Sequence, residues 1–260
     1  MRRILHLSDV HFGPPHRAEL SEALLELVER RRPDLVVVSG DLTQRAKAGQ
    51  FRQARHFVDR LPVPHLAVPG NHDVPMYRWA FLARIFAPFA AYRRHFSPEL
   101  EPTFEDEELL VVGINTAYNW TVRDGRVTPA QLARVRARLE AAPASRFKIV
   151  VAHHNLIQPP AFGGYRAIPT AATVVPALAR SGARLVLSGH THVTLRAESQ
   201  DWFPGDHPSL TLLHSGTSTS DRYRKHGPKE NTCFWIEVER GEAEVTLLRW
   251  DGGWQAESGG

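Results

Sequence analysis

The sequence predicts an α/β fold built on two packed β-sheets, and two features of its hydrophobic pattern support this. Six short runs rich in Val, Ile and Leu recur before residue 190 without apolar–polar alternation, which is typical of strands buried on both faces. Amphipathic helical patterns lie between several of these runs, as in the crossover units of a parallel sheet. After residue 190 the runs are strand-like and no long helix follows, which predicts a second, largely antiparallel sheet.

The expected elements alternate along the chain. The buried strands are residues 4–8, 35–39, 65–69, 109–115, 148–152 and 184–188. The helices are residues 18–31, 50–61, 129–141 and 171–180. Thr128 is the expected N-cap of the third helix, and Pro129 its first residue. The later strands are residues 193–199, 210–215, 233–239 and 244–250, so we assign 193–250 mostly to the second sheet.

No Ser/Gly linker or change in composition divides the chain, so we expect a single domain over residues 1–260. Residues 74–104 carry many aromatic and aliphatic side chains at largely helical spacing. We interpret this segment as a helical insertion packed on the sheet rim, and the alternative is a surface that binds a partner or a membrane.

The composition limits the function. With one cysteine, Cys233, the chain cannot form an internal disulfide or a thiolate cluster, so any metal must be held by nitrogen and oxygen ligands. The net charge is only +4, and the arginines are dispersed along the chain rather than gathered in a stripe. We therefore expect no nucleic-acid partner. The 14 histidines need another explanation.

No membrane-directed segment is expected. His6 and Asp9 interrupt the apolar N-terminal stretch too early for a signal peptide, and no window approaches eighteen apolar residues. The sequence thus predicts a cytoplasmic protein without a membrane span, and a homodimer is compatible with it.

Five of the expected strands end in residue types that bind metals. The blocks are Asp9-Val10-His11, Gly40-Asp41, Gly70-Asn71-His72-Asp73, His153-His154-Asn155 and Gly189-His190-Thr191-His192. Taken singly, each block also fits a turn, a helix cap or a hydrogen-bonded core histidine. Ligands of open α/β sheets lie beyond the carboxyl ends of the strands, where these five blocks converge. Together they predict a metal site.

The spacing of the blocks suits two ions. In extended backbone residues i and i+2 face the same way, so Asp9 with His11, and His190 with His192, would each face one cavity. Glycines before Asp41, Asn71 and His190 allow sharp turns or close approach. A carboxylate such as Asp41 suits the bridge between two divalent ions about 4 Å apart. Imidazole and carboxylate ligands suit Mn, Fe, Zn, Co or Ni, as divalent or mixed-valence ions, without selecting one.

In this order the blocks resemble the calcineurin-like metallophosphoesterase family. The resemblance covers residues 9 to 192 and implies a four-layer α/β/β/α sandwich of two mixed sheets with a dinuclear centre at the strand ends. It implies one ion held by Asp9, His11, Asp41 and His192, and another by Asp41, Asn71, His153 and His190.

The resemblance also implies roles around the metals. His72 would stabilise the transition state or protonate the leaving oxygen, with Asp73 as its orienting partner. Related sequences commonly read His-His-Pro where this chain has Asn155. We take His153 as the ligand there, and His154 is the rival ligand or a substrate-facing group.

A second resemblance concerns the substrate. Residues 71–75, 113–116 and 214–224 are similar to bacterial class III cyclic-nucleotide phosphodiesterases. Gly216 and Thr217 would then line the cleft, and Arg222 or Arg224 would meet a phosphate or base. We expect the rim segments 74–104, 156–170 and 199–209 to set specificity. The Gly-Gly pair within 156–170 is compatible with a loop that closes over the cleft and equally with a passive surface loop.

We therefore expect a phosphodiesterase that cleaves 3′,5′-cyclic nucleotides or another small phosphodiester through a hydroxide bridging two ions, with manganese and iron among the candidate metals. The first alternative is another small phosphodiesterase or monoesterase, acting on a glycerophosphodiester or a lipid-linked sugar nucleotide. Two further alternatives are a DNA nuclease of the same superfamily and an interaction scaffold that has lost its metals. Walker-type and GxSxG patterns are absent, which argues against P-loop and serine hydrolases.

Overall fold

Two six-stranded sheets form the centre of the protein in the computed structural model, which describes residues 1–76, 81–121, 123–223 and 228–257. The first sheet has the strand order β12-β11-β10-β1-β2-β3. Its strands are β1 (Arg2–Leu7), β2 (Leu35–Val38), β3 (His65–Ala67), β10 (Thr232–Glu239), β11 (Glu242–Trp250) and β12 (Trp254–Ala256).

The second sheet has the order β4-β5-β6-β7-β9-β8. Its strands are β4 (Thr103–Glu105), β5 (Leu109–Gly113), β6 (Phe147–Val151), β7 (Leu185–Ser188), β8 (Leu195–Glu198) and β9 (Thr211–His214). Strands β5, β6, β7 and β9 run parallel, while the edge strands β4 and β8 are antiparallel. Both sheets are therefore mixed.

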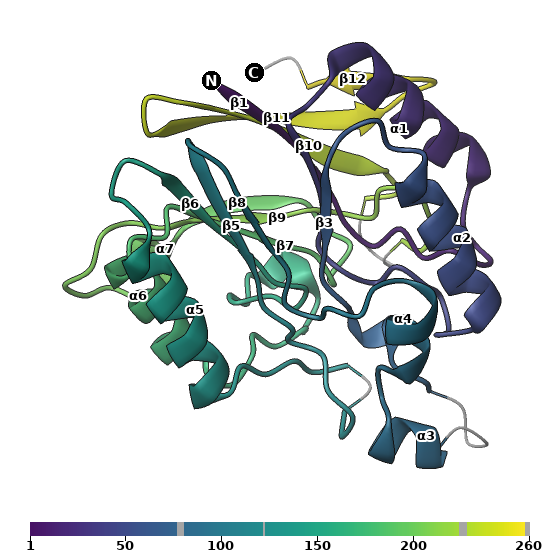
Figure 1. Ribbon diagram of the computed structural model, residues 1–260, viewed down its shortest axis with the longest axis horizontal. Helices are drawn as coiled ribbons and strands as arrows, with labels where there is room; N and C mark the ends of the chain where they lie inside the picture. The colour runs from purple at the N-terminus through teal and green to yellow at the C-terminus, as the bar shows by residue number, and fades with distance from the viewer. Residues whose placement is uncertain (77–80, 122, 224–227, 258–260) are drawn as a thin grey trace.

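Helices cover the outer face of each sheet and complete four layers (Figure 1). Helices α1 (Ala18–Arg31) and α2 (Ala48–Asp59) enclose one apolar core against the first sheet. Helices α5 (Pro129–Ala141) and α6 (Ala171–Arg180) enclose another against the second sheet. A third core, which includes Ile4, Val37, Val111 and Ile149, fills the space between the sheets. This is the expected α/β/β/α sandwich.

The assignment of residues 193–250 mostly to the second sheet is wrong. Only β8 and β9 join that sheet, whereas β10 pairs antiparallel with β1 and carries β11 into the first sheet. In Figure 1 the yellow C-terminal strands accordingly lie beside the purple N-terminal strand. The physical reason is that β2 pairs with only one edge of β1, and a late strand satisfies the backbone groups of its other edge.

Local sequence signals place the helix ends well. Helix α5 begins where expected, because Thr128 Oγ1 accepts a hydrogen bond from Gln131 N at 3.2 Å while Gln131 Oε1 accepts one from Thr128 N. Helix α1 ends at Arg31, followed by Arg32 in the left-handed conformation and by Pro33.

The segment 74–104 forms two short helices, and the two behave differently. In α4 (Ala90–His95) the fully buried Tyr92 packs against Phe51 of α2. In α3 (Phe81–Phe86) three large apolar side chains are instead exposed, namely Phe81, Leu82 and Phe86. The stretch 77–80 lies outside the described residues.

Candidate metal centre

The five blocks identified in the sequence converge at the carboxyl ends of the strands. Asp9 and His11 follow β1, Asp41 follows β2, Asn71 and His72 lie in a 3₁₀ turn after β3, and the histidine blocks follow β6 and β7. Eight described non-glycine residues have a positive φ, and five of them belong to these blocks: Asp9, His11, Asp41, His190 and His192. This conformation costs about 1–2 kcal/mol per residue and is concentrated here, as is typical of functional sites.

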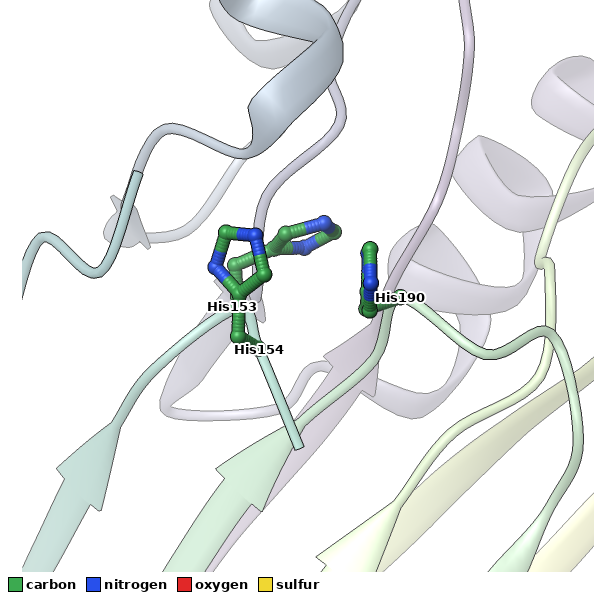
Figure 2. A group of neighbouring side chains, drawn as sticks. All are labelled: His153, His154 and His190. Atoms are coloured by element: carbon green, nitrogen blue, oxygen red, sulfur yellow. The ribbon is translucent and has the colours of Figure 1, made fainter. Parts of the chain in front are cut away.

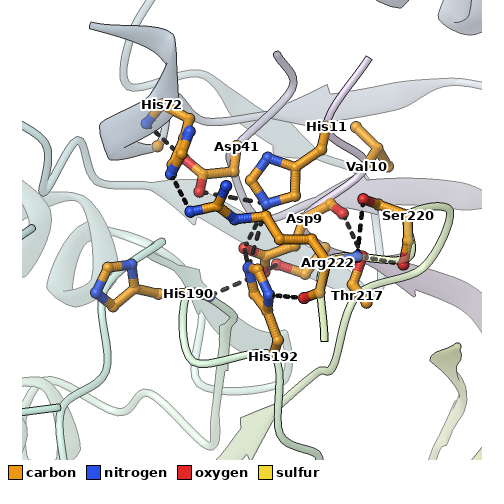
Figure 3. A network of polar contacts seen from close by, with 12 residues as sticks. Asp9, Val10, His11, Asp41, His72, His190, His192, Thr217, Ser220 and Arg222 are labelled. Carbon is orange, nitrogen blue, oxygen red and sulfur yellow. Dashed lines mark hydrogen bonds and ion pairs between the residues drawn. The ribbon is translucent and has the colours of Figure 1, made fainter. Parts of the chain in front are cut away.

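We expected residues i and i+2 of these blocks to share a cavity because the backbone is extended, but the backbone here is left-handed. Asp9 and His11 do face a common point, with Asp9 Oδ1 3.6 Å from His11 Nε2, but from φ values of 51° and 47° rather than from extended chain. His190 and His192 do not share a point, because His192 joins the Asp9 group while His190 joins His153 and His154. Figure 3 shows the His190 ring directed away from that of His192.

The first group of side chains, which we call the carboxylate-rich cluster, consists of Asp9, His11, Asp41 and His192. Asp9 Oδ2 accepts hydrogen bonds from Ser8 Oγ and His190 N, whereas the buried Asp9 Oδ1 has no hydrogen-bond partner. His192 Nδ1 donates to the Arg222 carbonyl, which leaves the lone pair of Nε2 facing Asp9 Oδ1 at 3.1 Å (Figure 3).

The second group, which we call the histidine-rich cluster, consists of His153, His154 and His190, with Asn71 beside them (Figure 2). His153 Nδ1 donates to the Ser39 carbonyl at 2.8 Å, so Nε2 is the ring nitrogen directed at Asn71 Oδ1, at 3.1 Å. Burial and the neighbouring histidines hold the pKa of both His154 and His190 well below the usual value, so both rings are neutral.

Asp41 connects the two clusters. Its Oδ1 lies 3.3 Å from His153 Nε2 and accepts a hydrogen bond from His72 N, while its Oδ2 lies 3.7 Å from His11 Nε2. Burial is the largest single influence on the pKa of this carboxyl and raises it, but His153, His72 and His11 together hold it well below its usual value, so the group is ionised. One oxygen therefore faces each cluster, as a bridging ligand requires.

The donor sets of both clusters fit cations. Around His153 the facing atoms are an imidazole nitrogen, a carboxylate oxygen and the Asn71 amide oxygen, and around His192 they are an imidazole lone pair, His11 Nε2 and a carboxylate oxygen. Such acceptors repel one another unless a positive charge lies between them. Burial lowers the pKa of His153, but Asp41, Asp9 and the Ser39 carbonyl together raise it to about 9, so in the absence of a metal a proton on Nε2 supplies the positive charge between these acceptors.

Glycines permit the close packing of the clusters. A Cβ atom on Gly70 would lie 2.1 Å from Asp41 Oδ1, and one on Gly189 would lie 1.7 Å from Ser8 Oγ. A Cβ on Gly40, whose φ is +95°, would lie 2.6 Å from the His153 ring. These glycines therefore allow the side chains of the two clusters to approach the backbone closely.

His72 and Arg222 form a polar pair next to the clusters. His72 Nδ1 donates to the Gln44 carbonyl at 2.8 Å, and its Nε2 accepts from Arg222 Nη2 at 2.9 Å (Figure 3). Burial lowers the pKa of His72 to about 3 although Asp41 opposes the shift. His72 is thus neutral and protonated on Nδ1.

Asp73 does not contact the side chain of His72, which it was expected to orient. Its carboxylate accepts hydrogen bonds from the backbone N–H groups of Leu42, Thr43 and Gly70, and His72 is oriented by Gln44 instead. Burial and the nearby Asp41 raise the pKa of Asp73 to about 7. The 3₁₀ turn directs adjacent side chains apart, so Asp73 fastens the β2 and β3 loops rather than orienting His72.

Three expected substrate contacts are not at the cavity surface. Thr217 is fully buried and donates to the Asp9 carbonyl, so it supports the loop after β1. Gly216 packs against Thr194 and Thr232, and His154 lies buried beside His153 and His190. Arg222 does line the cavity, whereas Arg224 lies outside the described residues.

A cavity of about 420 Å³ adjoins both clusters. Of the expected rim, Met76 and Tyr165 line it, and nothing from 199–209 does. The loop 156–170 is anchored by the buried Phe162, which contacts His214, while the Tyr165 ring contacts His190. Arg45 and Arg123 also line the cavity and were not predicted. Arg45 lies in the loop after β2, the same loop that carries Asp41, so its position was a signal. Arg123 lies in the long loop after β5, which carries none of the five blocks, so no local sequence signal marked it.

Comparisons with known proteins agree with this geometry. A probable cyclic nucleotide phosphodiesterase from Synechococcus sp. is 25% identical over 205 residues, spanning 73% of this chain and 72% of that protein. The glycerophosphodiester phosphodiesterase GpdQ of Enterobacter lignolyticus is 32% identical over 80 residues, spanning 27% of this chain and 29% of that protein.

Solved structures share the fold. A dimetal phosphatase from Danio rerio matches with a TM-score of 0.64 and 13% identity, over 95% of each chain. A purple acid phosphatase from yellow lupin matches with a TM-score of 0.69 and 11% identity over 95% of this chain, which spans about half of the phosphatase.

No helix in the described parts of the chain is long and apolar enough to cross a bilayer.

The calcineurin-like phosphoesterase family model matches residues 2–194, which contain every residue of the two clusters. The chain therefore belongs to the calcineurin-like phosphoesterase family and is a metal-dependent phosphoesterase.

Proposed function

We propose that the protein hydrolyses small phosphodiesters at a dinuclear centre. The observation that carries this proposal is the shared carboxylate of Asp41, which presents one oxygen to each cluster beside a cavity of about 420 Å³. When bound, two divalent ions supply Lewis-acid polarisation of the phosphoryl group and an activated water for in-line attack.

The ligand sets are part of the proposal. Asp9, His11, Asp41 and His192 hold one ion, and Asp41, Asn71, His153 and His190 hold the other. The orphan oxygen of Asp9 and the inward Nε2 atoms of His192 and His153 support this division. His154 is the rival of His153, because its buried Nε2 has no hydrogen-bond partner in the described structure.

His72 and Arg222 act on the phosphoryl side of the site. Arg222 donates to His72 Nε2 and faces the cavity, so its guanidinium is placed to bind a phosphoryl oxygen. The pKa of about 3 makes His72 a weak candidate for a standing proton donor at neutral pH. We therefore favour transition-state stabilisation by the pair over proton donation by His72 to the leaving oxygen.

The similarity to a cyclic nucleotide phosphodiesterase supports cyclic nucleotides as substrates, and the shorter similarity to GpdQ supports glycerophosphodiesters as the second candidate. Manganese and iron suit the imidazole and carboxylate donors.

The test is hydrolysis by metal-reconstituted protein. We expect release of p-nitrophenol from bis(p-nitrophenyl) phosphate at a higher kcat/KM than from p-nitrophenyl phosphate, with turnover of a cyclic nucleotide or of a glycerophosphodiester. Activity on monoesters alone would contradict the diester assignment.

A further inference from the structure

Three arginine side chains from distant parts of the sequence meet at the cavity. Arg45 lies between β2 and α2, Arg123 between β5 and α5, and Arg222 between β9 and β10. Asp41 is the only carboxylate that lines the cavity in the described structure, and it belongs to the metal clusters. The dispersion of arginine along the sequence therefore conceals a local concentration of positive charge in space.

These three arginines have no counter-charge within the described structure. None of them forms an ion pair with a described carboxylate, and their printed contacts are of other kinds. Arg222 Nη2 donates to His72 Nε2. Arg45 Nη1 lies 3.5 Å from the Gln44 carbonyl oxygen, and Arg123 Cζ lies 3.9 Å from the centroid of the Tyr165 ring.

The arginines at a second cavity are paired with carboxylates of the chain instead. This cavity, of about 570 Å³, is lined by residues of α1 and α2 and includes Arg17 and Arg60. Arg17 Nε lies 2.8 Å from Glu19 Oε1, and Arg60 Nη1 lies 2.6 Å from Glu22 Oε1. Carboxylates of the chain itself satisfy those arginines, whereas the arginines beside the metal clusters keep their charge available.

The three arginines lie at different depths. Arg222 contacts the buried His72 and so faces the reacting phosphoryl group. Arg123 is exposed and contacts Tyr165 rather than a member of either cluster, so its charge lies at the mouth of the cavity, and Arg45 is partly buried. One phosphodiester carries a single negative charge, which Arg222 and the bound ions already meet. The charge at the mouth is left for another group of the substrate.

We propose that the substrate is a phosphodiester that carries a second anionic group, such as a further phosphate, and that Arg45 and Arg123 bind this second group at the mouth of the cavity. This inference rests on the proposed phosphodiesterase function and narrows its substrate class. Guanidinium groups bind phosphate through two parallel charge-assisted hydrogen bonds, and the flat face of Arg123 is held in place by Tyr165.

The test uses two chromogenic diesters that differ only in the second anion. These are thymidine 5′-(p-nitrophenyl phosphate) and the same molecule with a phosphate on its 3′-oxygen, and both release p-nitrophenol. With metal-reconstituted protein we expect kcat/KM to be at least about tenfold higher for the 3′-phosphorylated diester, mainly through KM. This ratio should shrink as salt is added, because screening weakens exposed charge pairs.

The variants Arg123→Gln and Arg45→Gln/Arg123→Gln identify the residues responsible. We expect the ratio to fall severalfold in the first and to approach one in the second. Arg134→Gln is the matched control, because Arg134 is an exposed arginine paired with Glu101 far from the cavity lining, and it should keep the wild-type ratio. Thermal unfolding of each variant establishes that the fold is retained.

The outcomes separate the two proposals. If wild-type protein cleaves both diesters equally well, the second-anion assignment is overturned while the phosphodiesterase function stands. If it cleaves bis(p-nitrophenyl) phosphate but neither thymidine diester, the second-anion assignment is likewise overturned. If it cleaves none of the three diesters, the phosphodiesterase function itself is overturned. If the double variant keeps the wild-type ratio, Arg45 and Arg123 do not bind the second anion.

Discussion

The carboxylate-rich and histidine-rich clusters lie side by side, yet the chain builds them differently. The carboxylate-rich cluster draws both Asp9 and Asp41 from the first sheet and takes only His192 from the second. The histidine-rich cluster is made by three imidazoles that all follow strands of the second sheet. A cation therefore meets formal negative charge on one side and mostly neutral nitrogen on the other.

This difference shows that the site depends on residues from both sheets. Among the residues that the structure describes, Asp41 is the one carboxylate that faces both clusters, so it compensates for the low charge of the histidine-rich side. Neither sheet could make the site alone, and the core between the sheets fixes their separation.

Removal of the shared carboxylate should have the largest effect. In Asp41→Asn we expect kcat/KM for bis(p-nitrophenyl) phosphate to fall about a thousandfold or more, because both ions lose charge compensation. Metal analysis should show fewer than two ions per chain. Exposed His56→Asn is a suitable control. Retention of two ions and near-normal turnover would remove Asp41 from the bridging position.

Substitution of His153 and of His154 should show which of these adjacent histidines is a metal ligand in the histidine-rich cluster. His153→Ala should lose one ion at saturating metal, because His153 Nε2 lies among the Asn71 and Asp41 oxygens. His154→Ala should keep two ions and weaken the metal affinity about tenfold, as expected of a supporting residue. Equilibrium dialysis with metal analysis measures both. The reverse order would make His154 the ligand.

Close packing around the clusters predicts a stability effect. Gly70→Ala places a methyl group 2.1 Å from Asp41 Oδ1, so we expect the free energy of unfolding in urea to fall by about 1–3 kcal/mol. Gly253→Ala is the matched control, since its Cβ would meet nothing within 4 Å. Equal stability of the two variants would show that the loops relax without cost.

Two buried neutral histidines lie close to the clusters, and this gives a pH dependence. His6 contacts Ser39, whose carbonyl accepts a hydrogen bond from His153, and His214 contacts Ser188 and Thr191. Burial lowers the pKa of both to about 3. Between pH 6.5 and about 3 the unfolded chain binds protons at these positions and the folded chain does not, so stability is full above pH 6.5 and falls with decreasing pH.

The contribution of one such histidine is about 1.4 kcal/mol per pH unit within this window. His214→Gln should reduce the slope of unfolding free energy against pH by this amount. Urea unfolding of metal-free protein at several pH values provides the measurement. An unchanged slope in His214→Gln would mean that His214 is protonated in the folded state.

The sequence predicted the site better than its surroundings, for physical reasons. Strand ends and metal-binding residue types are local signals, so the blocks around Asp9, Asp41 and His190 were identified and do converge. The pairing of β10 with β1 depends on which edge of β1 has no other strand beside it, and neither segment's own sequence carries this information. The short strands β4 and β12 were missed because three residues give no periodicity.

The directions of side chains also could not be predicted from the sequence. The orientation of Asp73 away from His72 follows from a 3₁₀ turn, and the position of Arg45 and Arg123 at one cavity follows from the packing of the two sheets. Both depend on backbone angles and distances between segments that lie far apart in the chain.

Metal stoichiometry tests the central claim most directly. Metal-free wild-type protein titrated with Mn²⁺ and analysed by equilibrium dialysis should bind two ions per chain, and diester hydrolysis should appear only as the second ion binds. In His192→Ala, which alters the carboxylate-rich cluster alone, one ion should remain. Full activity with a single ion per chain, or two ions retained in His192→Ala, would contradict the assignment of one ion to each cluster.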